Sequence, residues 1–311
     1  MILVSVIIPT VNRPALLQEA IASALAQTHA EIEVIVVLNG ATSETVEMAE
    51  RFSADPKVRV AAMERGTLAA ARNFGMTFAR GEWIAFLDDD DIWLPQKIEI
   101  QLAAANNSGA DLVTCDYVHF DEHGDIAESG LGPRSDGLSY AEALMLENRL
   151  SGGSAAMVRA SAIRALGGFD PQLKGCEDWD MWRRLSWDHK IYCIDQVLVK
   201  YRRHGTNMTR DHSRMLQAEA RHFSKLLDDT PDKLRHMLPA AQRRYFLSVK
   251  VHLLAQGVRL KTSPAERMAE SITAFIRVIF HAADKLSLGR AGAALHGENR
   301  DRSPPDIVRG R

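Results

Sequence analysis

The sequence predicts an α/β protein in which helices flank a mostly parallel, doubly wound sheet and an α-helical C-terminal region follows. Two β-branched runs, 2–8 and 32–38, show no polar alternation, which is typical of strands buried on both faces of a parallel sheet. Segments with helical spacing alternate with such runs over the first 90 residues, and this alternation predicts right-handed βαβ units. After residue 211 every strong pattern is helical. In such sheets, ligands bind at the carboxyl ends of the strands.

The elements of the first half follow from punctuation as well as from periodicity. Pro9 ends the first strand, and Pro14 stands at the start of a helix that continues to residue 25. Asn39-Gly40 is a turn dipeptide after the second strand. The remaining elements predicted here are a helix over 43–53, a strand over 58–62, a helix over 67–80 with Gly81 as its C′ residue, and a strand over 83–87.

The second half is less regular. The pattern predicts a helix over 95–107, a strand over 111–120, a hairpin turn over 121–125, helices over 139–149, 158–166 and 178–188, and a strand over 190–200. We therefore expect a first domain over 1–210, a basic helical region over 211–296, and a flexible polar tail over 297–311.

Composition excludes several classes of protein. The chain has 311 residues, of which 46% are hydrophobic and 25% charged, so it is neither fibrous, nor largely disordered, nor a small disulfide-rich protein. Three cysteines without CxxC spacing predict free thiols in a reducing, cytoplasmic compartment. No stretch reaches the roughly 18–20 apolar residues that cross a bilayer, and the first nine residues read as a strand rather than as a secretion signal.

Charge is divided along the chain. Residues 1–200 carry 17 Lys and Arg against 29 Asp and Glu, whereas residues 201–311 carry 21 against 11. The front of the chain is therefore acidic and the back is basic, although the net charge is only −2. Any functional interpretation has to account for both halves.

Four consecutive acids, Asp88 to Asp91, are the strongest chemical feature. They directly follow the buried strand 83–87, at the edge where this class of sheet binds ligands. Four adjacent carboxylates repel one another and need a compensating cation, and Mg²⁺ or Mn²⁺ prefers one or two carboxylates together with phosphate oxygens. The alternative is an acidic loop in which one Asp caps the helix that starts near Pro95.

Several motifs in order resemble one known family. They are Ser5-Val-Ile-Ile-Pro-Thr10-Val-Asn12-Arg13, Ala71-Arg72-Asn73-Phe-Gly75, the run from Ala79 to Trp93, Gly167-Gly168-Phe169-Asp170, and Glu177-Asp178-Trp179-Asp180. The set is similar to family 2 glycosyltransferases of the GT-A fold and covers residues 1 to about 210. This resemblance implies inverting transfer of a sugar from a nucleotide-diphosphate donor to a hydroxyl of a glycan, a lipid-linked or another acceptor. It also implies a divalent cation, Mn²⁺ or Mg²⁺, at an Asp-x-Asp motif.

The resemblance assigns roles to the acids. Asp90 is the expected direct metal ligand, and Asp88 and His204 are further metal candidates. Asp88 or Asp89 would face the donor ribose or sugar. Asp178 matches the general base, which must lie opposite the leaving group in an inverting displacement. The bland alternatives are an N-cap or first-turn acid for Glu177-Asp178 and an ordinary strand-end histidine for His204.

Other positions match the two substrates. Pro9, Thr10, Asn12, Arg13 and Arg72 match nucleotide-sugar contacts, although Arg72 could also be a surface residue of an amphipathic helix. Gly153, Ser154, Glu177 and Trp179 match the acceptor side, and the alternative for Gly152-Gly153-Ser154 is simply a loop.

One position departs from the family pattern. An acidic pair usually follows the second strand, but this chain has Leu38-Asn39-Gly40 there. Asn39 both donates and accepts hydrogen bonds, whereas Asp only accepts, so the nucleobase contact must differ and the identity of the base is open.

The basic back carries an apolar stripe at helical spacing within 269–283. It indicates either packing, against the first domain or in a homodimer, or peripheral contact with an anionic membrane, which would place the protein at the inner face of the membrane near a lipid-linked acceptor. The dispersed basic residues lack an aromatic stacking pattern, so we expect no nucleic-acid partner.

The overall expectation is an inverting glycosyltransferase of surface polysaccharide or glycoconjugate assembly. A nucleotidyltransferase is the alternative enzyme, but it would want a Gly-rich, basic loop after the first strand, which the chain lacks. A non-catalytic nucleotide-binding module of the same fold is the other alternative. The intact Asp88, Asp90 and Asp178 argue against it.

Overall fold

The structure is a computed structural model that describes residues 2–129, 137–150, 152–205, 207–208 and 211–255. All of these belong to one compact unit, residues 1–256. The apolar stripe within 269–283 and the polar tail 297–311 lie outside the described residues.

The first half of the chain forms a parallel sheet. Its strands are β1 (Val4–Thr10), β2 (Ile32–Asn39), β3 (Val58–Met63) and β4 (Trp83–Phe86), in the spatial order β3-β2-β1-β4. Every residue of β1, β2 and β4 is buried, as the unbroken β-branched runs predict.

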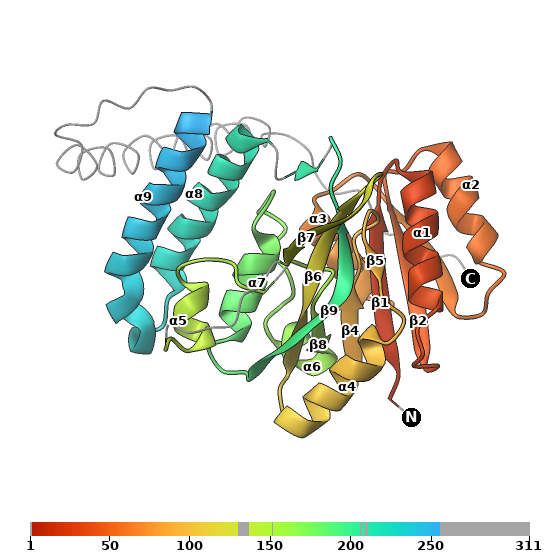
Figure 1. Ribbon diagram of the computed structural model, residues 1–311, viewed down its shortest axis with the longest axis horizontal. Coiled ribbons are helices and arrows are strands. Elements are labelled where there is room, and N and C mark those ends of the chain that lie inside the picture. The colour runs from red at the N-terminus through yellow and green to blue at the C-terminus, as the bar shows by residue number, and fades with distance from the viewer. Residues whose placement is uncertain (1, 130–136, 151, 206, 209–210, 256–311) are drawn as a thin grey trace, which may run out of the picture. The chain divides into compact units, whose positions relative to one another are not determined.

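Alternate residues of the strands serve two cores on opposite faces. Val4, Val6 and Ile8 pack with α1 (Pro14–Leu25), α2 (Ser43–Phe52) and α4 (Lys97–Ser108). Ile7 points the other way and packs with α3 (Leu68–Met76), α6 (Ala160–Ala165) and α7 (Glu177–Leu185). Figure 1 shows these helices around the sheet.

The second half extends the same sheet in mixed orientation. Beyond β4 the order continues β8 (Met157–Arg159), β6 (Leu112–Asp121), β9 (Ile191–Arg202) and β5 (Ile92–Trp93), while β7 (Gly124–Ser129) forms a hairpin with β6. Strands β8 and β5 run antiparallel to their neighbours, whereas β6 and β9 pair in parallel. The expected mostly parallel sheet flanked by helices is confirmed.

Several boundaries predicted from the sequence are wrong, and the helix predicted over 139–149 covers only Tyr140–Leu144. Residues 157–159 form β8 rather than the start of a helix, because Val158 pairs with both Ile84 and Leu112. Helix α3 ends at Met76, so Gly81 is not its C′ residue. A Cβ on Gly81 would lie 2.6 Å from the backbone nitrogen of Ser5, and this close approach to β1 is what requires glycine there.

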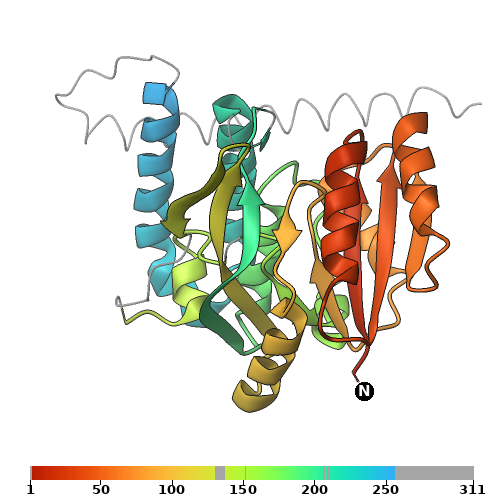
Figure 2. The ribbon, with the colours of Figure 1, turned by 45° about the vertical axis from the view of Figure 1, so that its right-hand side comes forward.

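The described part of the basic back is a helical pair that packs on α5 (Tyr140–Leu144) and α7. Helix α8 (His212–Asp229) leads through a 3₁₀ turn, η2 (Asp232–Met237), into α9 (Leu238–Ala255). Met145, Leu226 and Ala241 belong to the small core between these elements. In both ribbon views α8 and α9 lie beside α7 and away from α1 and α2 (Figures 1 and 2).

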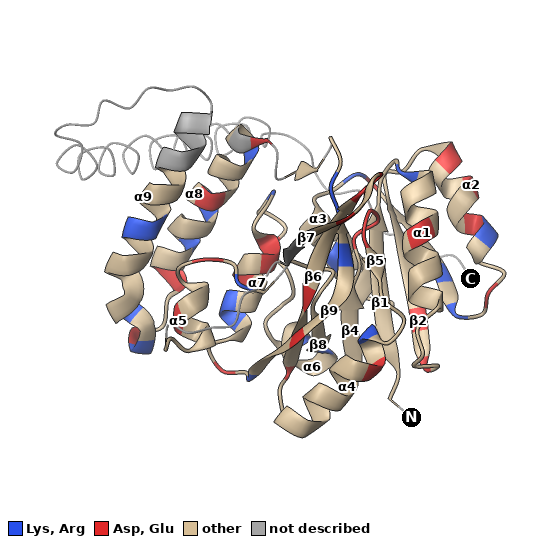
Figure 3. Cartoon of the chain, in the orientation of Figure 1, with Lys and Arg blue, Asp and Glu red and all other residues tan. Residues whose placement is uncertain are grey.

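Ion pairs link α7 to α8, and Figure 3 shows that both helices carry acidic and basic residues. Arg183 of α7 donates to Asp229 at 2.8 Å, and Lys225 of α8 donates to Asp180 at 2.9 Å. Asp180 and Arg183 are completely buried and also pair with each other. None of the helices within the described residues is long and apolar enough to cross a membrane.

Candidate active site

The acidic turn Asp88–Asp91 lies between β4 and β5, beside the ends of β1 and β9. Each of its four carboxylates has a different set of partners, so the turn is an ordered structure rather than a solvated acidic loop. The partners come from residues far along the chain, and they divide the turn into parts with different chemistry.

Asp89 is tied to the loop after β1. Its Oδ2 accepts a hydrogen bond from Thr10 Oγ1 at 2.7 Å, and its Oδ1 accepts from Arg13 at 3.2 Å. Burial raises the pKa of Asp89 to about 6, against the opposing effect of the Arg13 charge. Arg13 also pairs with Asp90, so the loop after β1 and the acidic turn hold each other in place.

Asp90 and His204, which the resemblance assigns to the metal, lie next to each other. Asp90 Oδ2 lies 3.0 Å from His204 Nε2, so the two side chains form a hydrogen-bonded pair. Asp88, the third metal candidate, pairs instead with Arg72. Among the described residues no three His, Cys, Asp or Glu side chains form a ready metal cluster. A cation here would therefore need further oxygen ligands, which suits an ion that also binds substrate phosphates.

A hydrogen bond between Asp91 and Ser154 holds the acidic turn in place. Asp91 is buried, and burial raises its pKa well above the ordinary value. Its Oδ2 accepts from Ser154 Oγ at 2.5 Å, and the same hydroxyl accepts from the backbone nitrogen of Asp88 at 3.1 Å. Ser154 was expected on the acceptor side. It lines the same pocket as Arg72 and Asp178, and its hydroxyl already forms hydrogen bonds with the acidic turn.

Arg72 is a buried bridge, not a surface residue of an amphipathic helix. It is 1% exposed, and it donates to Asp88 Oδ1 at 2.7 Å and to Glu177 Oε1 at 2.8 Å. Burial alone would lower the pKa of Arg72, but the charges of Asp88, Glu177 and Asp178 raise it above its ordinary value. The carboxylates that flank it therefore share one permanent cation.

Gly153 lies directly against this bridge. A Cβ at that position would come within 2.6 Å of Arg72 Nη2, so only glycine leaves room for the guanidinium. The sequence places Gly153 on the acceptor side, and it lines the same pocket as Arg72.

Glu177 and Asp178 open helix α7, and the N-cap is Cys176, at φ +57°. The two acids are therefore first-turn residues and not the cap. Burial raises the pKa of Glu177 to about 7, with Arg72 opposing the effect and Asp178 adding to it. Burial likewise raises the pKa of Asp178. Asp178 accepts hydrogen bonds from the Trp179 backbone nitrogen at 2.7 Å and from Asn148 Nδ2 at 3.3 Å.

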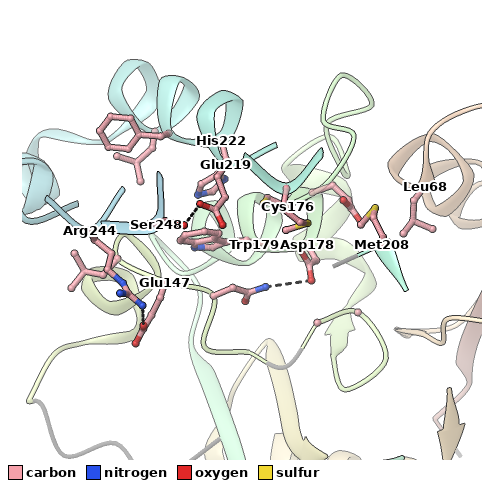
Figure 4. Close-up of a pocket in the computed structure, with 18 of the residues that line it drawn as sticks. Leu68, Glu147, Cys176, Asp178, Trp179, Met208, Glu219, His222, Arg244 and Ser248 are labelled. Carbon is pink, nitrogen blue, oxygen red and sulfur yellow. Dashed lines mark hydrogen bonds and ion pairs between the residues drawn. The ribbon is translucent and has the colours of Figure 1, made fainter. Parts of the chain in front are cut away.

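Two pockets of about 640 Å³ each adjoin at these residues. Asp88 and Glu177 line both of them. The first pocket contains most of the residues assigned to the nucleotide-sugar, namely Pro9, Thr10, Arg13, Asn39, Asp88 and Asp89, and also the metal candidate Asp90. The second contains Asp178 and Trp179 together with Arg72 and Gly153 (Figure 4). Arg72, which the resemblance assigned to the nucleotide, thus faces the second pocket.

Asn39 and Asn12 have local partners. Asn39 Oδ1 accepts from Gly66 N at 2.6 Å, and its Nδ2 donates to Gly66 O at 3.1 Å. The amide therefore clamps the loop after β3 in both directions, which a carboxylate could not do. Asn12 accepts from the Thr42 backbone nitrogen at the start of α2 and does not line the first pocket.

Three basic residues of the first pocket were missed from the sequence. Arg65 follows β3, Lys174 precedes α7, and Arg214 begins α8. They stand in three separate segments with no shared motif, so spacing could not have revealed them. Together with Arg13 they bring four basic side chains to the pocket, and such side chains can bind a diphosphate.

The helical pair α8–α9 was also not expected at the site. Its residues line the far part of the second pocket, beyond Trp179. His222 of α8 stacks on the Trp179 ring with centroids 4.3 Å apart, and Trp179 Nε1 donates to Leu144 O at 2.6 Å. The basic back of the sequence thus forms a wall of the pocket that holds Asp178.

Comparison with known proteins identifies a family for the chain. Residues 5–167 match the family model described as glycosyl transferase family 2. An uncharacterized glycosyltransferase of Rickettsia prowazekii is 29% identical over 262 residues, which are 82% of this chain and 81% of that one.

Solved structures share the fold at low sequence identity. S. aureus TarS 1–349 in complex with UDP-GlcNAc has a TM-score of 0.61 at 16% identity, over 88% of this chain and 81% of that one. The mannosyltransferase PcManGT of Pyrobaculum calidifontis, in complex with GDP-Man and Mn²⁺, has a TM-score of 0.60 at 19% identity, over 94% and 86%. The expected GT-A fold is confirmed, and, because the family model spans more than half of the sequence, the chain belongs to glycosyltransferase family 2.

Proposed function

We propose that this chain transfers a sugar from a nucleotide-diphosphate donor to an acceptor hydroxyl, with inversion, by metal-assisted direct displacement. The observation that carries the proposal is the junction of the two pockets. A pocket lined by Arg13, Lys174, Arg214 and by Asp90, which pairs with His204, adjoins a pocket that contains Asp178, and Asp88 and Glu177 line both. A donor in the first pocket and an acceptor in the second would meet at this junction.

The donor side fits a nucleoside diphosphate with a divalent cation. The Asp90 carboxylate and the His204 imidazole are one oxygen and one nitrogen ligand, a set that suits Mn²⁺ and leaves positions for phosphate oxygens. When bound, the cation would neutralise charge on the diphosphate leaving group. Arg13, Lys174 and Arg214 line the same pocket and would hold the diphosphate by charge.

The acceptor side supplies the base. Asp178 is half-buried, and the raised pKa that burial causes makes its carboxylate a stronger proton acceptor. Hydrogen bonds from Asn148 and from the backbone of Trp179 fix the orientation of the carboxylate. In this mechanism Asp178 takes the proton of the attacking hydroxyl. Arg72 binds the carboxylates of Glu177 and Asp88, so these two groups do not take that proton.

The donor nucleobase belongs to the proposal as an open choice. The related structures bind UDP-GlcNAc and GDP-Man. Asn39 lines the donor pocket, but both of its amide atoms already bind Gly66. We infer that the base is read by the shape and backbone of the loop that Asn39 clamps rather than by the Asn39 amide itself.

We extend the proposal to the cellular role. We place the reaction in surface polysaccharide or glycoconjugate assembly at the inner face of the membrane. Residues 1–210 would then supply the catalytic domain, and the described helices of the basic region 211–296, α8 and α9, would supply a wall of the acceptor pocket.

A thermal-shift panel tests the donor site. UDP, GDP, CDP and dTDP are added to the full chain with and without Mn²⁺, and the cognate nucleotide at 100 times its Kd should stabilise it by about 2.7 kcal/mol. Asp90→Ala should lose the Mn²⁺-dependent part, whereas Asp125→Ala, which removes an acid paired with Lys200 outside both pockets, should keep it. Stabilisation by no nucleotide, or an Asp90→Ala response equal to wild type, would refute the donor assignment.

The same panel separates binding from catalysis. Asp178→Asn should keep the nucleotide response, because Asp178 lies outside the donor pocket. Release of nucleoside diphosphate from the cognate donor should fall about 10²–10⁴-fold, the usual contribution of a general base. Near-normal release by this variant would show that another group takes the proton.

A further inference from the structure

The second pocket changes chemical character along its length. Near the junction it is lined by charged groups, among them Asp88, Arg72 and Asp178. Past the stacked rings of Trp179 and His222 it continues between α8 and α9, as Figure 4 shows. The side chains that line this far part are mainly apolar, including Met145, Leu146, Phe223, Leu226, Tyr245 and Leu247.

The charged side chains of the far part are already paired. Arg244 donates to Glu147 at 2.9 Å, and Glu219 accepts from Ser248 (Figure 4). The His222 ring is buried, and its nitrogens have no hydrogen-bond partner among the described residues. Burial and the nearby Arg183 charge lower the pKa of His222 to about 3, so the ring is neutral. A neutral, stacked imidazole adds to the apolar character of this wall.

We propose that this far part binds the apolar anchor of the acceptor, an alkyl or isoprenoid chain attached to the sugar that carries the reacting hydroxyl. The inference rests on the proposed transfer reaction, and it selects one acceptor class for the pocket that contains Asp178. An amphipathic molecule matches the order of the lining: its hydroxyl end lies near Asp178, and its apolar end lies between α8 and α9.

An unsubstituted oligosaccharide fits this wall less well. Sugar hydroxyls need unpaired donors and acceptors, and the ion pair and hydrogen bonds of the far part would have to break before they could bind such groups. An apolar chain needs no such exchange, because it gains by leaving water. Leu247, a lining residue that is 54% exposed, would lose its contact with water on binding.

Alkyl β-D-glucosides with methyl, butyl, hexyl and octyl chains, kept below their micelle-forming concentrations, test this proposal by calorimetry on the full chain. Each buried methylene should strengthen binding about fourfold, so burial of four of the seven added methylenes gives about 250-fold between methyl and octyl glucoside. Equal affinity for methyl and octyl glucoside would overturn the proposal.

Two matched variants locate the effect. Leu247→Asp should reduce the methyl-to-octyl gain at least tenfold, and its melting temperature should stay near wild type because Leu247 is more than half exposed. Ile2→Asp changes another exposed apolar residue outside the pocket and should retain the gain. A chain-length gain that survives Leu247→Asp would place the alkyl chain elsewhere and overturn the proposal.

The remaining outcomes are also decisive. Nucleotide stabilisation in the thermal-shift panel reports the donor site, so its absence refutes the proposed function whatever the glucosides do. A flat glucoside series with intact nucleotide stabilisation refutes only the apolar anchor. Sedimentation velocity covers a second copy: a dimer that Leu247→Asp dissociates and octyl glucoside does not would assign this surface to dimerisation and overturn the proposal.

Discussion

Replacing Arg72 by methionine tests the buried bridge between the two pockets. Methionine keeps the apolar stem but leaves Glu177, which is 4% exposed, without its cation. Removing one partner of a buried ion pair usually costs about 3–5 kcal/mol. Asp88 contributes less to this cost, because its side chain is 29% exposed and water screens its charge. We therefore expect a loss of about 3–5 kcal/mol in the free energy of unfolding at pH 8.

The loss should depend on pH with a defined sign. The pKa of Glu177 is raised from 4.5 to about 7 in the folded state, so its ionisation destabilises the fold as pH rises through this range. Without Arg72 this pKa rises further, because the cation opposes the effect of burial. At pH 6 the variant should hold Glu177 neutral, and wild type with a pKa of about 7 should also be mostly protonated there, so the loss should fall by up to about 1.4 kcal/mol, to roughly 2–4 kcal/mol.

Urea denaturation followed by tryptophan fluorescence at pH 6 and pH 8 measures both effects. The matched control is Arg80→Met. Arg80 Nε lies 2.8 Å from Glu33 Oε2, and the Arg80 side chain is 73% exposed. Its cost should stay within about 1 kcal/mol at either pH. Combining Arg72→Met with Glu177→Gln should remove the pH dependence. Equal losses in the Arg72 and Arg80 variants, or a pH-independent loss in Arg72→Met, would refute the reasoning.

Two further substitutions test other parts of the site. His222→Phe keeps a ring on Trp179 but removes a base whose pKa burial lowers to about 3. Between pH 7 and pH 4 the free energy of unfolding of wild type should therefore fall by about 3 kcal/mol more than that of the variant, because the histidine becomes protonated in the unfolded state but stays neutral in the folded state. Chemical denaturation at several pH values measures this difference, and parallel pH curves for the two proteins would contradict it. Asn39→Asp places a carboxylate against the Gly66 carbonyl and removes the Nδ2 donor. The free energy of unfolding at pH 7 should therefore fall by about 1–3 kcal/mol. An unchanged urea midpoint for Asn39→Asp would show that the clamp contributes nothing.

The fold class was predictable because the signals are local. Strands buried on both faces of a parallel sheet consist of unbroken apolar runs, so β1, β2 and β4 could be predicted from the local sequence pattern. Strands β5 and β8 were missed because two or three residues carry no period. Pairing with distant neighbours alone makes them strands.

The acids of the site were also predictable, but their roles divide in space. Asp88 to Asp91 are adjacent in sequence, yet Asp89 binds Thr10 and Asp91 binds Ser154. The turn directs each side chain toward a different element, and no spacing rule gives these directions. Arg72 similarly has the pattern of an ordinary helix residue until α7 brings Glu177 against it.

The sequence by itself determined the parallel sheet, the position of an acidic turn at a strand's carboxyl end, and the acids that begin α7, because each depends on residues close together along the chain. Only the tertiary structure decided that Arg72 is a bridge, that Arg65, Lys174 and Arg214 share a pocket, and that the basic back becomes a wall beside Asp178. These features depend on contacts between segments that are about a hundred residues apart in the chain. Such contacts are set by how the helices and strands pack rather than by any local pattern.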